Sequence, residues 1–124
     1  MKIVVAATQH AHALSRRQVE ALFAALPTAF ADDVETFVLA NWLRGSEPFE
    51  FITSHYRIEF CMPVVDKTPA TTEAALREFL LGLARMQAGS TFWKPLDRSE
   101  RRGYDEFIDT HLPACRAALG LQAD

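Results

Sequence analysis

The stretch from residue 71 to residue 87, TTEAALREFLLGLARMQ, constrains this chain more than any other, because its apolar residues recur with the period of a helix. One face of that helix would carry Leu76, Phe79, Leu80, Leu83 and either Met86 or Gln87. Leu81 lies off this stripe, so the helix needs apolar neighbours on two sides. We therefore expect a fold built around one long, largely buried helix.

Local signals mark where this helix and two others begin and end. Thr68 is expected to cap the central helix, with Pro69 at its first position and Gly89 just past its end. Ser15 and Gln18 have the spacing of a capping box, which predicts a second helix from there to Leu26-Pro27.

The third helix is expected to begin at Asp97, which stands three residues before Glu100 as an N-cap residue would. Pro113 lacks a backbone N–H, so we expect a kink or a fresh start near His111.

Four apolar segments are expected to be strands: residues 2–7, 34–40, 49–53 and 56–65. The first is rich in Ile and Val after Lys2 and is interpreted as buried. The last two form a hairpin through Ser54 and His55. In the last, Ile58 and Phe60 share one face, whereas Arg57 and Glu59 share the other. A polar face favours an antiparallel sheet that is covered on one side.

Together these elements predict an α+β fold in the order β-α-β-β-β-α-α. We expect a two-layer sandwich, with a small, mainly antiparallel sheet of three to four strands and about three helices on one face. With 124 residues, the chain is expected to form a single domain, 1–124.

Composition argues against two classes of partner. The net charge is −3, so no basic excess favours nucleic acid. The basic cluster Arg98, Arg101 and Arg102 is interleaved with acidic residues and is interpreted as a solvated helix face. No apolar run has the roughly 20 residues that a membrane span needs. No signal peptide is recognised, so a cytoplasmic location is expected.

From Leu14 to about Tyr104, the order of elements resembles a minimal zincin-like (zinc metallopeptidase-like) domain. In that family a helix ending near Leu-Pro precedes strands and an active helix. Here these elements correspond to Leu26-Pro27, the strands 34–40 and 56–65, and the helix beginning near Thr71.

The family's active helix carries HExxH, in which two histidines bind zinc and the glutamate acts as general base. Residues 77–81 (REFLL) keep only the glutamate, and residues 82–86 (GLARM) keep none of the three. The resemblance therefore implies a domain that binds no metal and does no hydrolysis, and we expect no cofactor.

His10 and His12 form the one close histidine pair in the sequence. In an extended segment, residues i and i+2 point the same way, as two metal ligands must. His55, Asp32 or Asp33 would supply a third ligand. The alternative is two exposed loop histidines.

His111 and Cys115 lie one helical turn apart and are either a base and its nucleophile or a packed histidine beside a buried thiol. Cys61 and Cys115 have no metal or redox spacing and are interpreted as buried free thiols. No P-loop, dinucleotide fingerprint or nucleophile elbow is present.

Candidate binding residues are aromatic or lie beside the hairpin. Phe92 and Trp93 fall in a predicted loop, where they either meet a partner or fold back onto the core. His55 and Arg57 follow the hairpin turn, and Arg57 with Glu59 forms either a cross-strand ion pair or a binding surface. Trp42, at a strand end, has the same ambiguity as Trp93.

These features favour a non-catalytic accessory protein that binds a protein or peptide, or associates with itself through Trp93 or an open strand edge. The alternatives are a small metal-dependent, hydrolase-like enzyme that uses His10 and His12, and a structural subunit of a larger assembly.

Overall fold

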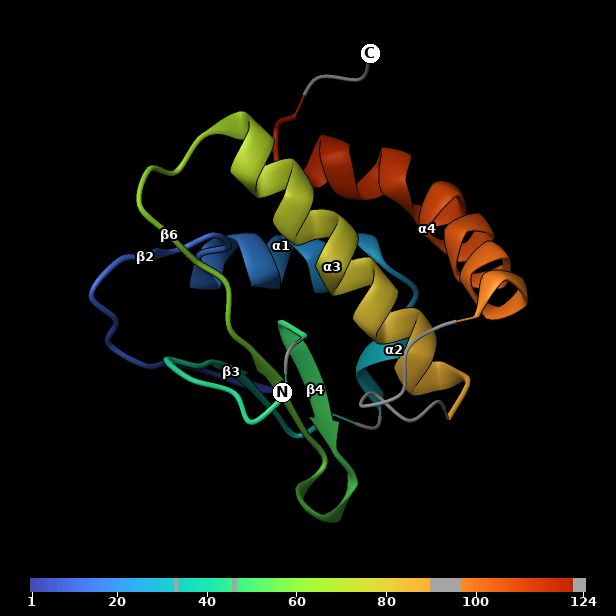
Figure 1. Cartoon of the computed structure of the whole chain (residues 1–124), viewed down its shortest axis with the longest axis horizontal. Coiled ribbons are helices and arrows are strands. Elements are labelled where there is room, and N and C mark those ends of the chain that lie inside the picture. Colours follow the sequence, from blue (N-terminus) through green and yellow to red (C-terminus); the bar gives the residue numbers. More distant parts are fainter. Residues whose placement is uncertain (33, 46, 90–96, 122–124) are drawn as a thin grey trace.

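The computed structural model describes residues 1–32, 34–45, 47–89 and 97–121, and within them the chain has the expected α+β fold (Figure 1). The four-stranded sheet contains β1 (Lys2–Val5), β3 (Thr36–Leu39), β4 (Phe49–Ile52) and β5 (Arg57–Phe60). A second sheet pairs β2 (Ala11–His12) with β6 (Pro63–Val64). The helices are α1 (Arg16–Ala25), α2 (Ala29–Asp32), α3 (Pro69–Gln87) and α4 (Arg98–Ala118), and the short η1 (Thr53–His55) joins β4 to β5.

The strand order is β1-β3-β5-β4, and the sheet is mixed rather than mainly antiparallel. β1 pairs with β3 and β3 with β5 in parallel, whereas β4 and β5 form the expected antiparallel hairpin. The expectation was wrong for β1 with β3 because α1 and α2 lie between them in the chain. A helical crossover carries the chain from the carboxyl end of one strand back to the end of the sheet where that strand began. The next strand therefore runs parallel to it. The expectation was also wrong for β3 with β5, because β4 comes between them and runs antiparallel to β5.

One face of the sheet carries the core, as the alternation in 56–65 predicted. Phe37, Leu39, Ile58 and Phe60 are buried beneath the helices. The long helices α1, α3 and α4 lie on that side of the sheet, and α4 packs on both α3 and α1 (Figure 1). Among the described residues, no helix covers the opposite face, so this sheet has two surfaces of different character.

The helix signals are confirmed at the termini. Ser15 with Gln18 and Thr68 with Thr71 form capping boxes, and Asp97 accepts a hydrogen bond from the Glu100 N–H at 2.8 Å. Gly89, past the end of α3, has φ +69°, a left-handed conformation that glycine adopts without strain.

Of the two expected outcomes near His111, a kink or a fresh start, the fresh start is wrong, because α4 continues through Pro113 as one helix. Proline removes the donor to the carbonyl four residues earlier, which belongs to Asp109. Asp109 and Pro113 are both exposed, so water can hydrate that carbonyl. Of the described helices, none is long and apolar enough to cross a membrane.

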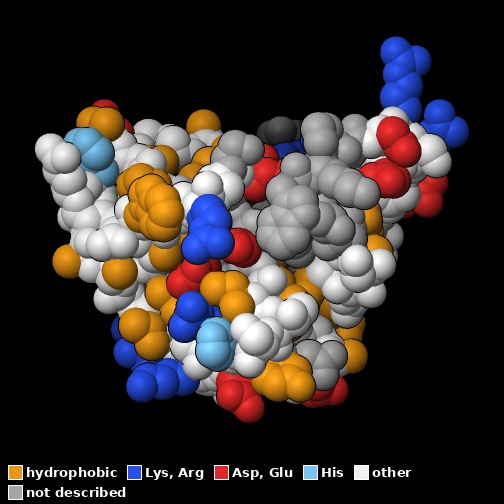
Figure 2. All heavy atoms as spheres, turned by 60° about the horizontal axis from the view of Figure 1, so that its bottom comes forward, with side chains coloured by type: hydrophobic (Ala, Val, Ile, Leu, Met, Phe, Trp, Pro, Cys, Tyr) orange, Lys and Arg blue, Asp and Glu red, His pale blue; other side chains and the backbone are white. Residues whose placement is uncertain are grey.

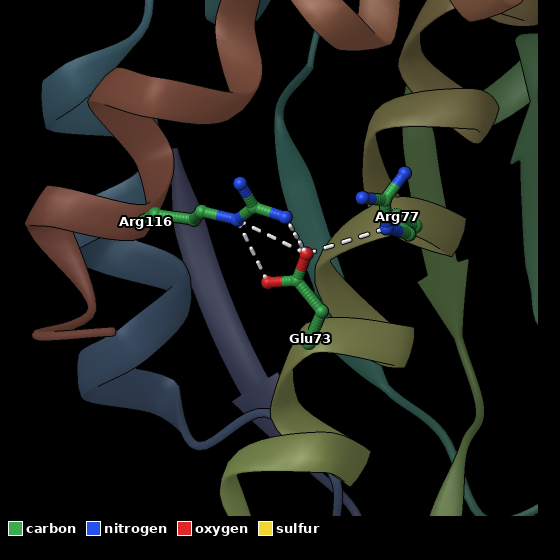
Figure 3. Close-up of polar contacts among 3 residues, drawn as sticks. All are labelled: Glu73, Arg77 and Arg116. Carbon is green, nitrogen blue, oxygen red and sulfur yellow. Dashed lines mark hydrogen bonds and ion pairs between the residues drawn. The ribbon is translucent and has the colours of Figure 1, made fainter. Parts of the chain in front are cut away.

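Helices α3 and α4 are joined by a charged clamp (Figure 3). Arg116 of α4 donates from Nε to both carboxylate oxygens of Glu73 of α3, at 3.0 and 3.1 Å, and also from Nη2. Arg77, one turn along α3, lies 3.3 Å from the same carboxylate. The hydrogen bond from Arg116 is the main cause that lowers the pKa of Glu73. The clamp therefore stabilises the packing of α4 on α3 when Glu73 is ionised.

Replacing Glu73 by glutamine should lower the free energy of unfolding by about 1–2 kcal/mol at pH 7. Because the folded pKa is depressed, this contribution is present above the ordinary carboxyl pKa and is lost as pH falls through the folded pKa. Urea unfolding of both proteins across the acid range tests this. A difference between wild type and Glu73→Gln that persists undiminished at the lowest pH would contradict it.

Candidate functional site

In the part of the chain that the structure describes, β1 is an edge strand whose outer side has no partner strand, although its apolar sequence predicted a buried strand. Lys2 N–H donates to the Glu35 carbonyl at 2.9 Å, and Ala6 N–H donates to the Leu39 carbonyl at 2.8 Å. Backbone groups alternate sides along a strand, so the N–H and C=O groups of Ile3 and Val5 point away from β3. An apolar run does not distinguish a central strand from an edge strand, because the neighbour that would cover it is not encoded locally.

Apolar side chains gather on this edge. Six large apolar residues stay exposed in the described part of the chain, and three of them are Met1, Val4 and Val5, at 49%, 37% and 49% exposure. Val4 stands on the open face of the sheet, opposite Val38. Natural sheets usually protect an exposed edge with charges, proline or a bulge, and of these β1 has only Lys2 at its first position.

A hollow of about 460 Å³ lies just beyond the carboxyl ends of β1 and β3. Its walls come from the segment after β1, from the residues after β3 and from Pro63. The segment after β1 crosses this end of the sheet and forms β2, which pairs with β6 after β5. The residues lining the hollow are Ala7, Thr8, Gln9, His10, Asn41, Trp42 and Pro63.

The two histidines of the proposed metal pair have different surroundings. His10 is exposed in the hollow, whereas the half-buried His12 is within hydrogen-bonding distance of the Ala6 carbonyl through Nε2, at 2.8 Å. Asp32 and His55 precede β3 and β5, so both lie at the other end of the sheet from His12, which pairs with Pro63. Asp33 lies outside the described residues.

Within residues 1–32, 34–45, 47–89 and 97–121, no group of three or more His, Cys, Asp or Glu is placed to hold a metal ion. The third ligands proposed from the sequence, His55 and Asp32, are separated from His12 by the length of a strand, roughly 13 Å for four residues. The structure thus does not bring His55 or Asp32 close enough to His12 to share a metal ion.

The open sheet face carries charges of both signs among apolar side chains (Figure 2). Arg57 Nε lies 3.6 Å from a carboxylate oxygen of Glu59, so the ion pair forms along β5 and not across strands. Glu59 stands opposite Glu50. His55 is exposed in η1, at the hairpin turn. Phe92 and Trp93 lie outside the described residues.

His111 and Cys115 do not have the properties of a catalytic dyad. The His111 ring packs against the rings of Phe30 and Phe107, with centroids 5.3 and 4.7 Å away. Cys115 is fully buried, and burial raises the pKa of its thiol to about 11. A reactive cysteine needs a thiolate, which this environment disfavours. The interpretation as a packed histidine beside a buried thiol fits this geometry.

We expect Cys115 to resist alkylation in the folded protein. Iodoacetamide labelling at pH 8, followed by peptide mass spectrometry, should modify Cys115 only when denaturant is added. Cys61 is half-buried, and burial raises the pKa of its thiol too, so it should react slowly but before Cys115. Fast labelling of native Cys115 would mean that its surroundings are open.

A second hollow, of about 740 Å³, lies between α3, the start of α4 and the residues before β4. Arg98, Arg101 and Arg102 line it, together with the acidic residues Glu47, Glu78, Asp97 and Asp105. Arg101 pairs with Asp105 at 3.4 Å, and both side chains are more than half exposed. Burial, and then the Glu47 carboxylate, raise the pKa of Glu78. These mixed charges fit the solvated helix face expected for the basic cluster. They do not form a site of one charge that would attract an anion or a cation.

Sequence reasoning singled out His10, His12, His55 and Arg57 but did not find the free edge of β1. It placed Trp42 at a strand end and left open whether the indole meets a partner or folds back onto the core. The sequence does show that Trp42 and His10 each follow a predicted strand. Bringing them into one hollow requires the strand order, which the sequence does not give. No protein-family model matches this chain, and comparisons with curated proteins and with solved structures give no significant match.

Proposed function

We propose that this chain is a non-catalytic binding domain that takes up an extended segment of a partner protein along β1. The single observation that carries this is the outer side of β1, where Ile3 and Val5 offer backbone N–H and C=O groups beside exposed valines. An added strand gains main-chain hydrogen bonds from such an edge and specificity from its alternate side chains.

The surroundings of β1 indicate the chemistry of that segment. Val4 is on the open face, and Ile3 and Val5 are on the face that carries the core. A partner strand would therefore meet apolar side chains on both of its faces, which favours β-branched residues. Lys2, at the start of β1, favours an acidic residue at that end. We expect antiparallel addition, which is slightly more stable per residue than parallel.

A displayed library of extended peptides tests the proposal. Selected binders should lose at least about tenfold in affinity for Val5→Pro, a loss of about 1.4 kcal/mol. This substitution removes an outward N–H and no bond to β3, so the sheet should remain intact. Val4→Lys should weaken binding as well. Val65→Lys is the matched control, since Val65 is 76% exposed and follows β6, which pairs with β2 and not with β1.

Two outcomes would contradict the proposal. Binders that keep their affinity for both Val5→Pro and Val4→Lys would use another surface. In a second selection, peptides that also bind Val5→Pro are removed first. If no extended peptide is then enriched on the wild-type protein, β1 has no binding role.

A further inference from the structure

The hollow at the carboxyl ends of β1 and β3 has a feature that strand addition does not explain. Trp42 is 71% exposed on its wall, although an indole is the largest apolar side chain and contributes most when it is covered. Neighbouring Asn41 is also exposed. An aromatic surface beside hydrogen-bonding groups is the usual composition of a small-molecule site, and the volume falls in the usual range.

The polar groups in this hollow are uncharged when the histidine is neutral. They are the hydroxyl of Thr8, the amides of Gln9 and Asn41 and the imidazole of His10. Each amide both donates and accepts hydrogen bonds, as does a neutral imidazole. None of the described residues that line the hollow is Lys, Arg, Asp or Glu, which would match a phosphate, a carboxylate or a hard metal ion. The lining thus matches a neutral ligand rich in hydroxyl groups.

The segment that forms one wall is held at several points. His12 Nε2 lies 2.8 Å from the Ala6 carbonyl, and Ala13 N–H donates to the Met62 carbonyl at 2.8 Å. Within the segment, the Thr8 hydroxyl donates to the His10 carbonyl, which leaves its oxygen able to accept. A wall fixed in this way loses little conformational entropy when a ligand binds. Its position also agrees with the rule that open sheets bind ligands beyond the carboxyl ends of parallel strands.

We propose that this hollow binds a neutral sugar, with one face of the ring stacked on Trp42 and its hydroxyl groups bonded to Asn41 and Gln9. A sugar ring has one face of C–H groups and a rim of hydroxyls, so it matches an indole beside two amides. A single aromatic wall suits such a ring, whereas a planar base is held best between two faces. This proposal does not rest on the binding of a strand at β1.

Titration with cellobiose, maltose, lactose and chitobiose tests the proposal, with the Trp42 indole N–H resonance as the readout. Trp93→Phe serves as the reference protein, so that Trp42 gives the one indole signal. At least one disaccharide should shift this signal saturably. Trp42→Ala should weaken that binding by about tenfold or more, and Asn41→Ala by a smaller factor. Both residues are exposed, so the melting temperature should not change.

The other results would overturn the proposal. If none of the four sugars shifted the Trp42 signal, the hollow would not be a sugar site. If a sugar bound Trp42→Ala with the affinity that it has for the reference protein, its site would lie elsewhere on the molecule. Adenosine, inorganic phosphate or zinc shifting the signal when no sugar does would show that the hollow takes a different class of ligand. A lower melting temperature for Trp42→Ala would show that the indole is part of the packing.

Discussion

Gly82→Ala is expected to lower the free energy of unfolding by about 2–3 kcal/mol, although alanine is the better helix former by about 1 kcal/mol. A Cβ at position 82 would lie 2.1 Å from Cγ of Phe49, and 2.3 and 2.4 Å from two further ring atoms. The Phe49 ring has Phe60 and Phe79 as neighbours, with centroids 6.4 and 6.3 Å away. The ring therefore has little room to move.

The control for this prediction is Gly103→Ala, in α4. No atom lies within 4 Å of a Cβ built there, so this change should stabilise the protein by up to about 1 kcal/mol. Phe49→Leu should recover part of the loss in the Gly82→Ala background. Urea unfolding of the single and double variants measures this coupling. If both glycine substitutions had the same effect, the close approach of α3 to β4 would be wrong.

Glu47→Ala is expected to cost about 2–3 kcal/mol, since it removes a carboxylate that neutralises a buried cation. The Arg85 side chain is 1% exposed, and its Nη1 donates to both Glu47 oxygens at 2.6 and 2.5 Å. Glu47 is itself 34% exposed, so water replaces part of what is lost. The cost should therefore be below the 3–5 kcal/mol that breaking a wholly buried pair entails.

Two variants make this prediction specific. Glu20→Ala removes one partner of the exposed Arg16–Glu20 pair and should cost less than about 0.5 kcal/mol. Arg85→Met in the Glu47→Ala background replaces the buried charge by an apolar chain of similar length, and should recover most of the stability. If Glu47→Ala and Glu20→Ala proved equally mild in urea unfolding, Glu47 would not be the main group that neutralises Arg85.

Helix positions followed from the sequence because capping and periodicity are local. The Ser15 and Thr68 caps, the Asp97 start and the end at Gly89 each depend on residues within one turn. The hairpin of β4 and β5 was predictable for the same reason. The fold class followed from these elements together.

Strand order and the environment of each strand were not predictable, since they depend on residues far apart in sequence. The parallel pairing of β1 with β3 comes from the crossover through α1, and it leaves β1 at an edge. Gly82 gave no local sign that its missing side chain accommodates Phe49. Likewise, Trp42 and His10 reach one hollow because the segment after β1 crosses the end of the sheet.

The resemblance to a zincin-like domain stays a prediction. It rests on the order of elements, in which the helix beginning near Thr71 was expected to correspond to the family's active helix. Residues 77–86, which lack the histidines, lie on α3, and most are buried against the sheet and α4.

Amide hydrogen exchange at Ile3 and Val5, measured by NMR with and without a selected peptide, tests the proposed function most directly. In the free protein these two amides should exchange quickly, because they point away from β3, whereas the Ala6 amide should be protected. A bound peptide should protect Ile3 and Val5 and leave exchange elsewhere on the sheet nearly unchanged. Peptide binding that leaves both amides unprotected would contradict strand addition at β1.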